Sequence, residues 1–227
     1  FTGILAKKFP KIIQEISKNG HEIGCHYYHH NNIYNDTILN FKYNIEKSKN
    51  ILEEVSGKKV NGFRAPKFTI NKNDDKFFKI INDNFEYDSS LNIISINDIF
   101  YNNLKNKYPT LHLLPVFASK HIFNFVKYKP GGTYMKIMPY NFLKKNIKMT
   151  YINNFNPIIY IHPYEFLTEK EFAFTFKDFN NKKNFFKYYW YLRQNQWHSF
   201  NNSLIKKLDK IFDLYESGGT LISQISN

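Results

Sequence analysis

The chain has 227 residues, of which 42% are hydrophobic and 19% aromatic, so it can bury a substantial core and is not a disordered chain. Its formal net charge is +13, but the lysines are scattered and no recognisable nucleic-acid motif accompanies them, so nucleic acid is not an expected partner. A single cysteine, Cys25, excludes an intrachain disulfide, and no apolar run approaches the roughly 20 residues of a membrane-spanning helix.

The first ninety residues alternate between strand and helix patterns. A strand end is predicted at 1–5, and an amphipathic helix from Lys7 to Asn19 is stopped by Gly20. The further elements that we predict in this part are a short strand that enters the histidine cluster, helices at 37–55 and 73–84, and strands at 60–64 and 85–88. Such alternation is typical of βα units around a parallel sheet or barrel, in which the carboxyl ends of the strands carry the site.

The rest of the chain is less regular. We predict strands at 111–116, 157–161 and 220–225, and helices at 138–149 and 184–217. The run at 157–161 is the most strand-like of the whole sequence. No internal repeat and no convincing linker interrupts the chain, so a single domain is predicted over 1–227.

Four histidines lie within ten residues, at His21, His26, His29 and His30. Imidazole is the commonest protein ligand of metals, so the cluster predicts a metal or acid–base site. On a straight strand His26 and His30 would lie ~13 Å apart, too far to share an ion, whereas on a turn they would be ~5–6 Å apart. His26 with His29 fits equally well, and a solvated His-rich loop is the alternative to a metal site.

Three other polar residues end predicted strands. Arg64 can orient a carboxylate or make an ordinary surface ion pair. His162 can act as a general acid or base, or be a hydrogen-bonded core histidine. Asp88 can orient a histidine, or serve a turn with Ser89 and Ser90. The sequence lacks a P-loop, a G-x-G-x-x-G, a G-x-S-x-G and a paired-cysteine metal site.

The order of these segments resembles the polysaccharide deacetylase family, the NodB-homology group or carbohydrate esterase family 4. The segments that carry the resemblance are Gly20-His21-Glu22-Ile23-Gly24-Cys25-His26-x-x-x-His30, Gly62-Phe63-Arg64-Ala65-Pro66, Tyr87-Asp88-Ser89-Ser90, Gly131-Gly132-Thr133-Tyr134 and Tyr160-Ile161-His162-Pro163-Tyr164-Glu165-Phe166. The late segments are similar to the exopolysaccharide-biosynthesis branch. The resemblance implies an α/β fold, a distorted (β/α)7-type barrel incomplete at the N-terminus, with 166–227 as an aromatic-rich helical extension packed on the barrel.

The resemblance also implies a function and a set of site residues. The implied reaction is the metal-dependent hydrolysis of N-acetyl groups on amino sugars of a polysaccharide or oligosaccharide, with zinc as the expected metal. His26 and His30 match the metal ligands, and His162 matches the general acid. Arg64 matches the residue that orients a catalytic aspartate, and Asp88 matches loosely the acid that supports the histidine. The implied substrate and oxyanion contacts are Pro66, the backbone N–H of Lys67, and Tyr134.

One family motif has no counterpart. The family's Thr-Phe-Asp-Asp-like strand end supplies the catalytic aspartate and a third metal ligand, and it would precede Phe1; the only acids in 1–25 are Glu15 and Glu22. We therefore expect an N-terminally truncated deacetylase that is inactive as this chain alone. The alternatives are an allantoinase-like hydrolase of small amides and a degenerate, non-catalytic carbohydrate-binding member. The sequence leaves the location open between the cytoplasm and the cell envelope of a bacterium.

Overall fold

The computed structural model describes residues 1–71, 75–120, 127–169, 171, 173–181, 183–196, 199–216 and 219–225. The chain divides into two compact units, which are treated separately below. The first unit comprises Phe1–Val116 with Gly218–Asn227, and the second comprises Phe117–Ser217. In the part of the chain that is described, no helix is long and apolar enough to span a bilayer.

A parallel sheet organises the first unit. Its strands are β1 (Gly62–Phe63), β2 (Tyr87–Asp88) and β4 (His112–Leu113), in the order β1-β2-β4. Phe63 pairs with Asp88, and Asp88 pairs with Leu113. The predicted parallel strands are therefore confirmed, although each is shorter than its apolar run suggests.

Two further segments extend this row of paired residues beyond β1. Cys25 forms a parallel bridge with Phe63. On the other side of Cys25, the Phe1 carbonyl oxygen accepts from the His26 N–H at 2.8 Å, and the Phe1 amino group donates to the Gly24 carbonyl oxygen at 2.5 Å. The backbone at the histidine cluster is thus held from both sides.

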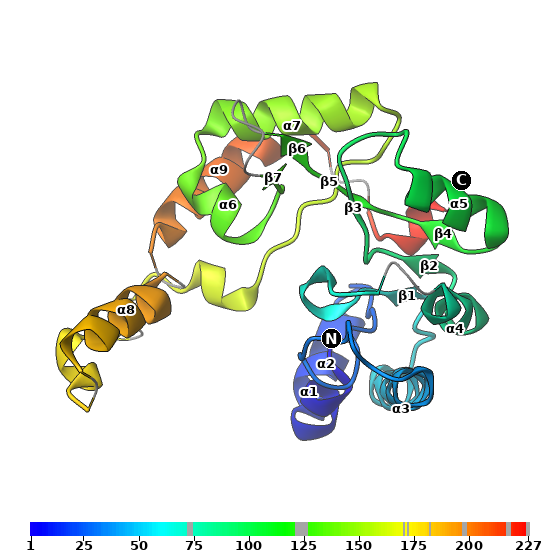
Figure 1. Cartoon of the computed structure of the whole chain (residues 1–227), viewed down its shortest axis with the longest axis horizontal. Helices are drawn as coiled ribbons and strands as arrows, with labels where there is room; N and C mark the ends of the chain where they lie inside the picture. Colours follow the sequence, from blue (N-terminus) through cyan, green and yellow to red (C-terminus); the bar gives the residue numbers. More distant parts are fainter. Residues whose placement is uncertain are drawn as a thin grey trace. The chain divides into compact units, whose positions relative to one another are not determined.

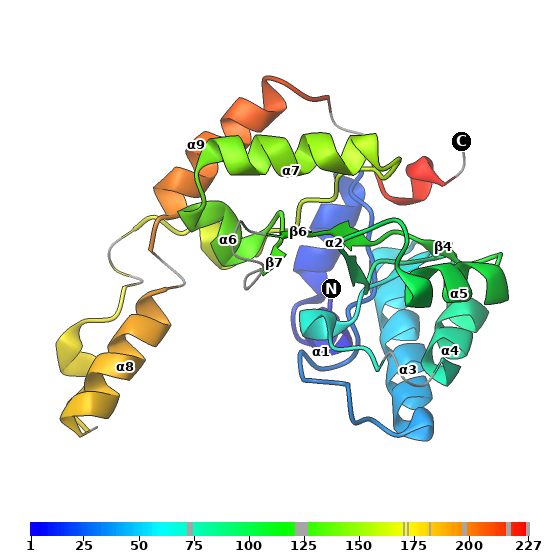
Figure 2. The ribbon, with the colours of Figure 1, turned by 45° about the horizontal axis from the view of Figure 1, so that its top comes forward.

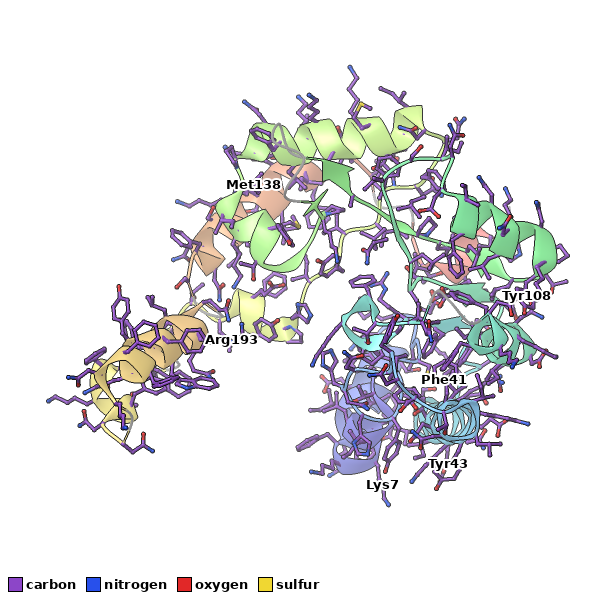
Figure 3. The ribbon with its side chains drawn as sticks, in the orientation of Figure 1. Lys7, Phe41, Tyr43, Tyr108, Met138 and Arg193 are labelled. Atoms are coloured by element: carbon purple, nitrogen blue, oxygen red, sulfur yellow. The ribbon has the colours of Figure 1, made fainter. Side chains whose placement is uncertain are left out.

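Helices surround the sheet in the first unit, as Figures 1 and 2 show. They are α1 (Gly3–Lys8), α2 (Pro10–Lys18), α3 (Ile38–Ser56), η1 (Pro66–Phe68), α4 (Lys76–Asn84), α5 (Ile99–Lys107) and η5 (Ile222–Gln224). A second small sheet pairs β3 (Asn92–Ile93) with β5 (Val116–Phe117). Phe41 on α3 is labelled in Figure 3. Its ring packs against Phe77 of α4 and Phe63 of β1, with centroids 4.7 Å and 6.1 Å apart. These aromatic contacts join the helices to the sheet.

Local sequence signals set the helix ends. Thr37 caps α3, because its hydroxyl oxygen accepts from the Asn40 N–H at 3.2 Å, and Gly57 ends the helix in the left-handed conformation.

The predicted single helix from Lys7 to Asn19 is wrong at its start: Pro10 separates α1 from α2, because proline has no N–H to continue the first helix. The strand predicted at 1–5 is also wrong beyond Thr2. The predicted helix at 73–84 is α4, and residues 73 and 74 lie outside the described residues.

The second unit is mainly helical. It contains α6 (Gly132–Ile137), α7 (Tyr140–Ile152), η2 (Pro163–Phe166), η4 (Phe176–Phe179), α8 (Asn184–Asn195) and α9 (Asn201–Phe212), with an antiparallel pair of β6 (Ser119–Lys120) and β7 (Lys127–Tyr128). Its core consists of apolar side chains from α6, α7 and α9, namely Met135, Leu143, Ile147, Leu204, Leu208 and Ile211. Figure 1 labels these helices in green to orange-red.

Two predicted strands are absent from the described residues. The run at 157–161 has only one β contact, a parallel bridge between Tyr160 and Gly131, and residues 222–224 form a 3₁₀ turn. Strand propensity measures how well side chains fit a paired sheet, so an apolar run without a neighbouring ladder does not become a strand. The predicted boundary at residue 166 falls inside the second unit, and the assignment of 1–227 to one domain stays a prediction.

Candidate functional site

The histidine cluster turns sharply after Cys25. Tyr27 has a left-handed backbone, with φ at 65°, which a bulky residue rarely adopts. Its buried side chain holds this conformation, because the Tyr27 hydroxyl donates to Asp36 Oδ2 at 2.6 Å. The turn brings the rings of His26 and His30 to a centroid distance of 5.1 Å. This is the arrangement in which two imidazoles can share one ion.

The hydrogen bonding of His26 leaves its Nε2 suited to bind a metal ion. Its Nδ1 lies 2.7 Å from the Arg64 carbonyl oxygen, and because a carbonyl only accepts, Nδ1 carries the proton and donates. Nε2 then carries a lone pair, as in many histidines that bind metals. Burial lowers the pKa of His26 to about 4, so the ring is neutral at pH 7, which is the form that coordinates a metal.

The other two histidines of the cluster lie differently. His29 is exposed, and its ring packs edge-on against Tyr28 with a centroid distance of 4.6 Å. His21 is exposed and precedes the paired backbone at Cys25. Of the two pairs that the sequence left open, the structure therefore brings together His26 and His30. Their role as metal ligands stays a prediction.

Arg64 follows β1, and its backbone N–H donates to the Cys25 carbonyl oxygen at 2.9 Å. Its guanidinium contacts the segment after the next strand, where Nε donates to the Ser89 carbonyl oxygen at 3.1 Å and Nη2 donates to Ser89 Oγ at 2.7 Å. Arg64 is therefore fixed between two strand ends, and its predicted task of orienting an aspartate stays a prediction. The contact with Ser89 was not foreseen.

The loop after Arg64 is strained. Pro66 is buried, and the two residues that follow it, Lys67 and Phe68, both have left-handed backbones with φ at 54° and 57°. Such conformations cost about 1–2 kcal/mol each for residues other than glycine, and they collect at functional sites. The Lys67 N–H belongs to this loop, and its use as an oxyanion donor, like the substrate contact of Pro66, stays a prediction.

Asp88 is buried in a small hydrogen-bond network. Its carboxylate accepts from the Ser90 N–H at 3.0 Å and from Ser90 Oγ at 2.5 Å, and that Oγ also accepts from the Ala65 N–H at 2.8 Å. Burial raises the pKa of Asp88 to about 6, opposed by the bonds from Ser90 and by the charge of Arg64. Asp88 thus ties β2 to the loop after β1, while its predicted support of a histidine stays a prediction.

We expect Asp88 to make stability depend on pH. A carboxyl whose pKa is higher in the folded protein binds more protons folded than unfolded, so the free energy of unfolding falls as pH rises from about 4 to about 6. Asp88→Asn removes this titration. Urea unfolding measures the free energy of unfolding of both proteins at pH 4 and at pH 7. The difference between variant and wild type should move in favour of the variant by about 2 kcal/mol from pH 4 to pH 7. Asp83→Asn, the same change at an exposed site, is the control; a pH-independent difference for Asp88→Asn contradicts the prediction.

The second unit holds the remaining predicted residues. His162 precedes η2, and its Nδ1 lies 3.3 Å from Oε2 of the buried Glu165. Tyr134 lies in α6, packed against the core of that unit. Sequence reasoning missed Glu165 as the acid beside His162, although histidine followed three residues later by Glu is the spacing of a capping box.

The family model described as polysaccharide deacetylase matches residues 1–80. This match contains His26, His30, Arg64 and the strained loop at Lys67. A search of curated proteins finds no match.

Three solved structures illustrate what this chain is similar to. A Mycobacterium smegmatis protein proposed to be a polysaccharide deacetylase is 18% identical with a TM-score of 0.54, over 99% of this chain and 68% of that one. This match shows the fold and confirms the predicted α/β barrel class. A CE4 family pseudoenzyme from Bacillus anthracis is 11% identical with a TM-score of 0.44, over 92% of this chain and 49% of that one. A polysaccharide deacetylase from Bacillus cereus is 13% identical with a TM-score of 0.37, over 93% of this chain and 73% of that one. This chain thus spans about half the length of the pseudoenzyme.

The donor set in residues 1–80 fits part of a metal site. Two neighbouring imidazoles, one with its Nδ1–H held by a carbonyl, are ligands suited to a divalent transition metal. Within the described ranges, no group of three or more His, Cys, Asp or Glu side chains is placed to hold an ion. A catalytic zinc normally has three protein ligands, so His26 and His30 need a further donor.

Proposed function

We propose that this chain carries part of the active site of a metal-dependent hydrolase that removes N-acetyl groups from amino sugars of a polysaccharide. The observation that carries the proposal is the pair of His26 and His30, 5.1 Å apart at the ring centroids, within the family match. The hydrogen bond from His26 Nδ1 to the Arg64 carbonyl oxygen supports it, because that bond presents Nε2 to an ion.

His26 and His30 would hold the divalent metal, for which we propose zinc. When bound, such a metal polarises the acetamide oxygen and lowers the pKa of a water molecule. The strained loop at Lys67 would direct its N–H at the developing oxyanion, and Arg64, fixed by Ser89, would orient the carboxylate that takes the proton from water. That carboxylate and the third ligand are required in addition to the residues described.

His162 would donate a proton to the leaving amine. Its Nδ1 faces the Glu165 carboxylate, so the proton to be transferred would sit on Nε2, on the opposite side of the ring. Tyr134 would contact the sugar. The Gly131-Gly132 and His162-Pro163-x-Glu165-Phe166 segments support an exopolysaccharide as the substrate class.

The proposal is tested with the protein expressed from the complete reading frame. We expect it to release acetate from N-acetylglucosamine oligomers, to lose activity on chelation and to regain it with added zinc. His26→Ala should abolish acetate release, and His29→Ala, an equal change on an exposed ring of the same cluster, should retain it. Hydrolysis of a ureide in place of the oligomers would show the allantoinase-like alternative. Oligomer binding without hydrolysis would show a degenerate member.

A further inference from the structure

Glu165 is a buried acid in the second unit that contacts His162 in two ways. Its side chain is 1% exposed. Oε2 accepts from the His162 backbone N–H at 2.8 Å and lies 3.3 Å from His162 Nδ1. The first bond fixes the backbone of His162 and the second fixes its ring, so one oxygen atom determines the orientation of the imidazole.

The other oxygen of Glu165 faces α6. A Cβ placed on Gly132 would lie 3.6 Å from Glu165 Oε1, which puts this oxygen against the first turn of the helix. Lys136 lies four residues after Gly132, on the same helical face, and is only 2% exposed. Burial lowers the pKa of Lys136, and the charge of Glu165 acts in the opposite direction, so the ammonium and the carboxylate stabilise each other.

Burying a carboxylate without a compensating charge costs several kcal/mol, which normally neutralises the group. The charge of Lys136 acts on this carboxylate, and the Lys136 ammonium itself donates to the Gln196 carbonyl oxygen at 3.4 Å. We propose that Glu165 is the positioning residue of His162. Its buried carboxylate holds both the backbone N–H and Nδ1 of a histidine whose side chain is 40% exposed.

The other groups around His162 do not replace Glu165. Tyr164 stacks on the imidazole at a centroid distance of 4.9 Å, and Tyr160 lies edge-on at 6.2 Å. From α9, the Lys207 ammonium donates to the carbonyl oxygens of Met135, Lys136 and Met138 at 2.6–2.8 Å, so its donors are directed at the end of α6. Among these neighbours, Glu165 alone is an acid, so it alone offers a carboxylate to Nδ1.

NMR of the His162 ring nitrogens in the 227-residue chain tests the proposal, with the signals assigned by His162→Gln. Glu165→Gln keeps the shape of the side chain and removes its charge. We expect it to loosen the preference for the proton on Nδ1, seen as a movement of the two ring ¹⁵N signals toward each other. Glu169→Gln, the same change on an exposed neighbour, is the control. Equal ring ¹⁵N shifts for the two variants would overturn the positioning role.

The use of His162 in hydrolysis rests on the proposed function, whereas the NMR comparison needs no substrate. A protein that hydrolyses nothing but shows the change in the ring ¹⁵N signals therefore refutes the proposed function alone.

Discussion

Gly62→Ala should destabilise the first unit by about 3 kcal/mol, because a methyl group at this position has no space. A Cβ on Gly62 would overlap the ring of Tyr87, which packs flat against the glycine from the neighbouring strand β2. Tyr87 cannot easily turn away, since it is 4% exposed and its hydroxyl donates to Glu22 Oε1 at 2.6 Å. Equilibrium unfolding in urea, monitored by circular dichroism, measures the loss.

The control for this substitution lies one strand away. A Cβ on Gly24 would lie 3.6 Å from the Gly62 carbonyl oxygen and 3.7 Å from the Tyr87 hydroxyl, which are ordinary contact distances. Gly24→Ala should therefore cost less than 1 kcal/mol, within the range of tolerated changes. In a double-mutant cycle, Tyr87→Leu should recover part of the loss in Gly62→Ala. Equal stability losses for the two alanine variants would show that the close approach of Tyr87 to Gly62 does not affect the free energy of unfolding.

Helices were the part of the fold that the sequence predicted best. Thr37, Gly57 and the apolar positions between them specify α3 by local rules alone, and the structure follows them within one or two residues. The split at Pro10 was also a local signal, and it was overlooked because the apolar spacing continues across it. The strand predicted at 157–161 failed for a different reason, since pairing depends on what lies beside the strand, and the sequence of the strand does not contain that information.

The candidate site, too, was predictable from the sequence only in part. The types of residue and their place after strands were predictable, because the carboxyl ends of parallel strands lie at one edge of a sheet. Spacing alone left His26 with His30 and His26 with His29 open, and only the family resemblance chose the first pair. The close approach of those two rings depends on the left-handed turn at Tyr27 and on the bond from Tyr27 to Asp36. Likewise, the contacts from Arg64 to Ser89 join segments 25 residues apart, and no pattern in the sequence foretells such a pairing.

Metal binding should separate the three histidines of the turn. We expect His26→Ala to weaken the binding of Zn²⁺ or Co²⁺ by ~100-fold or more, because it removes a ligand and the hydrogen bond that orients it, and loss of the outer bond alone is worth 10–100-fold. His30→Ala should have a similar effect. His29→Ala should change the affinity less than threefold, since its ring packs on Tyr28 and lies outside the close pair.

Titration of each variant with Co²⁺, followed by its visible absorption, gives the affinities, and isothermal titration with Zn²⁺ checks them. His29 is the decisive comparison: it shares the loop, the residue type and the exposure of His30 and differs in where the ring lies. A large loss of affinity in His29→Ala, with little in His30→Ala, would assign the site to His26 and His29. It would also mean that the turn at Tyr27 does not set the pair.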